Sequence, residues 1–132
     1  MKTFLFSAIL LFAVAVCAKA QTADTTLVIT FASTVHDYGT IEQGADGAYE
    51  FKFTNQGKTP LILNNVRSSC GCTVPSWTRE PVQPGSGGSI KVVYNTASIG
   101  AFNKSVTVSS NAKNSEVMLQ IKGNVVAKQQ SN

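Results

Sequence analysis

Two cysteines separated by one glycine, Cys70-Gly71-Cys72, are the residues of this chain best suited to do chemistry. Residues two apart on an extended strand have Cα atoms about 6.6 Å apart, near the upper limit of disulfide geometry, and Gly71 permits a tighter turn. A disulfide between Cys70 and Cys72 would close so small a loop that it would stabilise the fold by only about 1.5 kcal/mol. Such a strained bridge suits thiol–disulfide exchange better than it suits structural stabilisation.

Metal binding is a second chemistry open to the same cysteines, because soft thiolates favour Cu(I) or Zn. His36 is the single histidine of the chain, so Cys70, Cys72 and His36 make a set of only three ligands. The Cys-x-Cys spacing is also tighter than the usual Cys-x₂₋₄-Cys of zinc sites. A third interpretation is that the pair merely shapes a loop. We expect no cofactor, with copper or zinc at these three residues as the alternative.

The sequence contains no catalytic constellation. His36 and Asp37 are adjacent, and on a strand they would point to opposite faces, so that Asp37 could not orient the imidazole. The segment Asp37-Tyr38-Gly39 instead predicts a turn, in which Asp37 bonds to the local backbone and Gly39 takes a positive φ. We therefore predict that the protein is not an enzyme and has neither catalytic nor cofactor-binding residues.

The first twenty residues have the layout of a secretory signal peptide. Lys2 precedes an apolar run from about Phe4 to Ala18, which is shorter than the roughly twenty residues that a spanning helix needs. The small residues of Ala18-Lys19-Ala20 predict cleavage between Ala20 and Gln21. A lipid anchor on Cys17 is the weaker alternative, because Val16 stands where a small residue normally precedes a lipidated cysteine. We expect an exported protein, periplasmic or secreted, with no transmembrane helix after cleavage.

Charge and composition narrow the classes of partner. The chain has 132 residues, enough for one domain, with 14% charged residues, 43% hydrophobic residues and a net charge of +4. Lys2 and Lys19 lie in the predicted signal peptide, so the net charge falls to +2 in the mature chain. The other basic residues are spread singly along the sequence, whereas a nucleic-acid-binding protein clusters them. We therefore exclude nucleic acid as a partner.

Beyond residue 26, apolar and polar side chains alternate with the period of two that is typical of strands. Tyr49, Phe51 and Phe53, for example, are separated by polar residues, which predicts a strand with one buried aromatic face. Clusters of Gly, Pro, Asn and Asp bound the runs. Six or seven short strands without a helical pattern predict an all-β fold, an antiparallel β-sandwich. The strands are expected at residues 27–31, 49–53, 61–66, 90–94, 102–108 and 117–121, with 123–126 extending the last.

The ends of the mature chain are polar. We predict a flexible leader at residues 21–26, one sandwich domain at 27–126 and a polar tail at 127–132.

Several segments placed on these strands form a pattern known from a protein family. Its most specific element is Cys70-Gly71-Cys72-Thr73, and the others include residues 36–41, 49–57, 60–63, 100–104 and 121–123. Over residues 30–126 the chain resembles the short exported bacterial proteins grouped as domain of unknown function 1573. The resemblance implies an immunoglobulin-like sandwich of about seven strands, similar to the Hydin and major-sperm-protein modules. No activity is established for this family, so the resemblance implies no catalytic residue.

These observations predict an exported, non-catalytic domain that binds a protein partner or assembles on the bacterial envelope. The open edges of a sandwich offer strand addition as one docking mode. The alternative is a metal-binding or thiol redox protein that uses Cys70 and Cys72.

Overall fold

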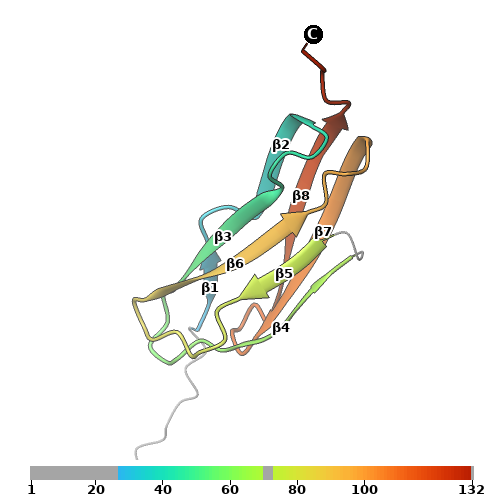
Figure 1. Cartoon of the computed structure of the whole chain (residues 1–132). Coiled ribbons are helices and arrows are strands. Elements are labelled where there is room, and N and C mark those ends of the chain that lie inside the picture. The colour runs from blue at the N-terminus through green and yellow to red at the C-terminus, as the bar shows by residue number, and fades with distance from the viewer. Residues whose placement is uncertain (1–26, 70–72, 132) are drawn as a thin grey trace, which may run out of the picture.

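A computed structural model of the chain describes residues 27–69 and 73–131 (Figure 1). Within these ranges the backbone forms eight strands and no helix, so no described segment could cross a membrane as a helix. The predicted signal peptide, its cleavage between Ala20 and Gln21, the lipid anchor on Cys17 and the leader at 21–26 lie outside the described residues. The strands are β1 (Ile29–Phe31), β2 (Val35–Glu42), β3 (Ala48–Asn55), β4 (Leu63–Ser68), β5 (Thr73–Trp77), β6 (Gly87–Tyr94), β7 (Gly100–Ser110) and β8 (Glu116–Val126).

The strands form two four-stranded sheets that pack face to face, one in the order β1-β3-β6-β5 and the other in the order β2-β8-β7-β4 (Figure 1). This arrangement confirms the predicted all-β sandwich. It differs in detail from the expected seven antiparallel strands, because β2 and β5 are additional strands and β2 pairs with β8 in parallel.

The first strand of the fold passes from one sheet to the other. The N–H of Ala32 still donates to the carbonyl of Lys52 on β3, at 3.0 Å, whereas the carbonyl of Thr34 already accepts from the N–H of Gln120 on β8, at 2.8 Å. The change of sheet therefore occurs within Ala32–Thr34. Because β2 continues in the direction of β1 while it joins a new neighbour, its pairing with β8 is parallel.

The core lies between the two sheets and is built from alternate residues of each strand. Phe51 and Ile90 from one sheet and Leu119 and Ile121 from the other are at most 1% exposed. Full burial of such a side chain contributes about 1.5–3 kcal/mol, so the alternating pattern supplies most of the driving force for closing the sandwich. The polar residues between them face solvent, as the alternation predicts.

One polar side chain, that of Asn55 at the end of β3, is fully buried and fully bonded. Its Nδ2 donates to the carbonyls of Thr59, at 2.8 Å, and of Val82, at 2.9 Å. Its Oδ1 accepts from the N–H of Gly57, at 2.8 Å. The carbonyl of Val82 also accepts from the N–H of Leu61, so the amide adds a second bond there and supplies the partner of the Gly57 N–H and of the Thr59 carbonyl. Asn55 thereby fixes both loops to the core.

Replacing Asn55 should therefore destabilise the whole domain. Asn55→Ala leaves the carbonyl of Thr59 and the N–H of Gly57 without their partner and removes one of the two bonds to the carbonyl of Val82, so we expect it to lower the free energy of unfolding by about 3 kcal/mol. Asn55→Asp should cost more, because a carboxylate cannot donate to either carbonyl and carries a buried charge. Urea denaturation followed by Trp fluorescence measures both changes.

The exposed neighbour Gln56 provides the control: Gln56→Ala should change the free energy of unfolding by no more than about 0.5 kcal/mol. A loss below about 1 kcal/mol for Asn55→Ala would contradict the role given to this amide.

Candidate functional site

The residues of the predicted thiol site, Cys70 and Cys72, are outside the described residues. In the sequence they stand between β4 and β5, which belong to different sheets. Before them, the N–H of Ser69 donates to the carbonyl of Ser105 at 2.8 Å. The disulfide between Cys70 and Cys72, and their role as metal ligands, stay predictions.

His36, the third candidate ligand, is held between aromatic rings. Its imidazole stacks on Tyr49 with ring centroids 3.6 Å apart and an interplanar angle of 9°, and it meets Tyr38 edge-on at 4.5 Å. Because His36 is on β2 and Tyr49 on β3, this stack joins the two sheets beside the point where the first strand changes sheet. Within residues 27–69 and 73–131, no three His, Cys, Asp or Glu side chains gather as a metal site would require.

The surroundings of His36 set two protonation equilibria. Burial lowers the pKa of His36 below 6.5, and the nearby carboxylate of Asp37 opposes this only in part. Burial, followed by the charges of Asp46 and Tyr49, raises the pKa of Tyr38 to about 12. The phenol therefore keeps its proton at neutral pH and donates to the carbonyl of Gly47 at 2.7 Å.

Asp37 serves the backbone and not the imidazole. Its Oδ1 accepts from the N–H of Gly39 at 2.8 Å, and Gly39 has a φ of +65°. Both features of the sequence prediction are present, but they form a bulge inside strand β2 and not a turn. The bulge between Asp37 and Thr40 lets the strand keep its pairing with β8 on either side of the glycine.

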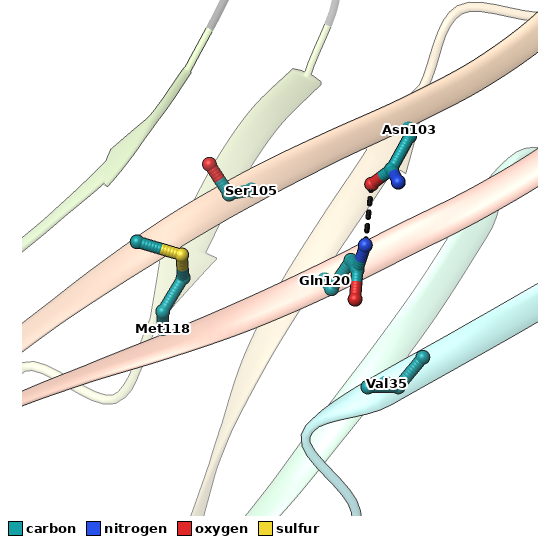
Figure 2. A pocket seen from close by; sticks show the side chains of 5 residues that line it. All are labelled: Val35, Asn103, Ser105, Met118 and Gln120. Atoms are coloured by element: carbon teal, nitrogen blue, oxygen red, sulfur yellow. Dashed lines mark hydrogen bonds between the residues drawn. The ribbon is translucent and has the colours of Figure 1, made fainter.

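A hollow of about 360 Å³ lies on the outer face of the β2-β8-β7-β4 sheet (Figure 2). It is lined by five residues from three neighbouring strands: Val35 on β2, Met118 and Gln120 on β8, and Asn103 and Ser105 on β7. None of the five is charged. Val35 is 43% exposed and Met118 is 65% exposed, so this hollow brings two apolar side chains to the surface of a sheet face whose other positions are mostly polar.

The register explains why these five residues meet. Gln120 stands opposite Ser105 on β7 and opposite Val35 on β2, so the three form a row across the sheet. Met118 and Asn103 flank that row along their strands. Sequence reasoning missed the hollow, because the parallel pairing that brings Val35 beside Gln120 leaves no local signal. The usable signal was Met118, an apolar residue at an outward position of a predicted strand.

The sequence of the chain matches a protein family over most of the described region. The pattern of the family described as "Protein of unknown function (DUF1573)" covers residues 29–125. The chain belongs to this family. No curated protein matches the chain significantly.

Solved structures place this DUF1573 domain among immunoglobulin-like sandwiches. A protein of unknown function from Porphyromonas gingivalis W83 is 19% identical with a TM-score of 0.68, over 80% of this chain and 50% of that one. The ASH/PapD-like domain 7 of human CEP192 is 10% identical with a TM-score of 0.66, over 97% and 100% of the two chains. The CupB2 chaperone of Pseudomonas aeruginosa is 10% identical with a TM-score of 0.52, over 77% and 57%. These likenesses confirm the immunoglobulin-like fold, and this chain spans only half of the P. gingivalis protein.

The two sheets of the DUF1573 domain have four edge strands among the described residues, β1, β5, β2 and β4. Three of them carry a feature that hinders the pairing of a further strand. On β1, the side-chain amide of Asn114 donates to the carbonyl of Ile29 and accepts from its N–H, at 3.0 and 3.1 Å. On β2, the hydroxyl of Ser33 donates to the carbonyl of Val35 at 2.8 Å. On β5, Pro75 has no N–H to offer. Such features hinder strand addition and favour binding on a sheet face.

The lowered pKa of His36 predicts how the free energy of unfolding depends on pH. Since folding lowers this pKa, the unfolded chain binds more protons than the native one at pH values between the lowered pKa and 6.5. The stability that the neutral imidazole contributes is complete above pH 6.5 and is lost as the pH falls through the lowered value. We therefore expect the free energy of unfolding to decrease from pH 7 to pH 5.

Two measurements check this expectation. An NMR titration of the single imidazole should give a midpoint below 6.5. The variant His36→Phe retains a ring against Tyr49 but cannot titrate, so its stability should change less between pH 7 and pH 5. A midpoint at or above 6.5, or the same pH dependence in both proteins, would show that the stacked imidazole is not desolvated.

Proposed function

We propose that this protein is an exported, non-catalytic immunoglobulin-like domain that binds a protein partner through the outer face of its β2-β8-β7-β4 sheet. The observation that carries the proposal is the pair of exposed apolar side chains, Met118 and Val35, beside one uncharged hollow. Exposed apolar groups that gather in one place favour association, because burying them in an interface releases ordered water. Methionine suits such a surface, since its flexible side chain adapts to a partner.

Two further observations support this proposal. The obstructed edges of β1, β2 and β5 favour face-to-face contact over the strand addition that the sequence suggested. The predicted signal peptide at residues 1–20 is the basis for export. A partner is therefore expected in the periplasm or outside the cell.

Site-specific cross-linking in the native envelope tests the proposal. A photo-reactive phenylalanine analogue placed at Met118 should cross-link to a discrete protein. Val93 is the matched control position, because it is a 39% exposed apolar residue on the outer face of the other sheet and should give no such product. The captured protein is then purified and its Kd for the full mature chain is measured.

Affinity measurements complete the test. We expect Met118→Lys to weaken binding of the captured protein at least tenfold, because the complex would then bury a charge in place of an apolar side chain. Val93→Lys should leave the affinity within twofold of the wild-type value. Equal effects of the two variants, or no Met118-dependent product, would overturn the proposal.

Thiol chemistry at Cys70 and Cys72 is the competing prediction, and it is tested separately. The double variant Cys70→Ser/Cys72→Ser should leave partner affinity unchanged if the sheet face carries the function. Metal analysis and thiol titration of the wild-type protein should then show neither bound copper or zinc nor a dithiol with a defined reduction potential. A stoichiometric metal, or loss of the cellular function in the double variant with intact partner binding, would favour the thiol alternative.

A further inference from the structure

The hollow contains two amide side chains that orient each other. The Nε2 of Gln120 donates to the Oδ1 of Asn103 at 2.6 Å (Figure 2). Each amide can donate two hydrogen bonds and accept two, so this single bond leaves the Nδ2 of Asn103 and the Oε1 of Gln120 available to a ligand. If both amides were turned over, the bond would reverse and one donor and one acceptor would still be presented. The pair therefore offers a donor and an acceptor side by side in either orientation.

The groups around this pair are apolar or weakly polar. In the row across the sheet, Val35 lies on one side of Gln120 and Ser105 on the other, while Met118 extends beyond the pair along β8 (Figure 2). The hydroxyl of Ser105 faces the same hollow. A ligand in the hollow would meet two adjacent hydrogen-bonding groups with apolar side chains at both ends.

The electrostatics of the hollow favour an uncharged ligand. None of its five lining residues is ionisable, and the nearest charges in the register are of both signs. Lys122 is opposite Asn103, Asp37 is opposite Lys122, and Arg67 is opposite Thr107, the partner of Met118. A charged group placed here would lose hydration without meeting a counter-ion among the lining residues, and the surrounding charges of opposite sign favour neither an anion nor a cation. A neutral group with one donor and one acceptor is complementary to the amide pair.

We propose that the hollow binds an extended, uncharged peptide segment of the partner protein, with the backbone of one residue held by the amide pair. In an extended segment the N–H and the carbonyl of one residue point to the same side, so the N–H can donate to the Oε1 of Gln120 while the carbonyl accepts from the Nδ2 of Asn103. The side-chain amide of Asn114 bonds the N–H and carbonyl of Ile29 in the same way. The neighbouring side chains of the segment pack against Met118 and Val35. This inference rests on the proposed protein-binding function and adds to it the chemistry by which the partner is recognised.

A peptide fits the observations better than a sugar. Sugar-binding sites commonly place an aromatic ring against the C–H face of the ring of the sugar, and the five lining residues include none. The peptide also does not join the sheet edge beside the hollow, because the hydroxyl of Ser33 already bonds to the carbonyl of Val35. Side chains of the sheet face, and not its backbone, therefore make the hydrogen bonds.

A peptide selection tests this inference independently of any cellular partner. A random dodecamer library is selected against the full mature chain, and the Kd values of synthetic peptides are measured by fluorescence anisotropy. We expect selected peptides to be uncharged in their central residues.

The near-isosteric variants Asn103→Leu and Gln120→Met should each weaken binding about fivefold, the effect of one lost hydrogen bond. Asn65→Leu, at an exposed position of β4 in the same sheet, is the matched control and should have no effect.

Side-chain NMR signals provide a readout that loss of stability cannot mimic. Peptide addition should shift the side-chain amide resonances of Asn103 and Gln120 in the wild-type protein more than that of Asn65. Peptides that bind both isosteric variants with wild-type affinity, or selected peptides that depend on charged residues, would overturn the inference. Binding of chitohexaose that is lost in Gln120→Met would overturn it in favour of a sugar.

The two proposals fail in different ways. If the captured partner depends on Met118 but is insensitive to Asn103→Leu and Gln120→Met, the protein-binding face stands and the peptide mode is wrong. If peptides bind the hollow through the amide pair but no Met118-dependent partner exists in the envelope, the recognition chemistry stands and the cellular role is wrong.

Discussion

The buried amide of Asn55 is the constraint on which one end of the sandwich depends. The loops after β3 and before β6 carry backbone groups that no strand can satisfy, and the core beside them excludes water. Asn55 supplies their partners, and its own backbone bonds to Ser86 and Gly85 in the next turn. Removal of this amide would leave the N–H of Gly57 and the carbonyl of Thr59 unpaired at once, which is more costly than the loss of any single exposed contact.

Other asparagines hold loops in the same way, which explains how a chain with few charged residues orders its connections. Asn111 accepts from the N–H of Ile62 and donates to the carbonyl of Pro60, and Asn114 bonds both backbone groups of Ile29. A short amide side chain suits this task, because it presents a donor and an acceptor with little conformational entropy to lose. The Asn103–Gln120 pair differs in that it is exposed, so its remaining groups are left for a ligand.

The alternation in the sequence predicted the strands whose alternate residues form the core. It did not predict β2 and β5, which contain residues that usually interrupt a strand. Strand β2 contains Asp37 and Gly39, which signal a turn, but its pairing with β8 tolerates them through a bulge. Strand β5 contains Pro75, which is acceptable only because β5 lies at a sheet edge. The hollow could not be predicted from local pattern, because it requires residues from β2, β7 and β8 in a register that only the folded sheet defines. The residues with evident chemistry, Cys70 and Cys72, lie outside the described residues.

The parallel pairing of β2 with β8 has a consequence for the order in which the chain can fold. Strand β1 can pair with β3, which follows it closely, whereas the strand partner of β2 is β8, the last strand of the fold. A chain that emerges from its N-terminus must therefore hold β2 without a strand partner until the residues of β8 have followed. Such distant contacts slow folding and keep the chain extended for longer.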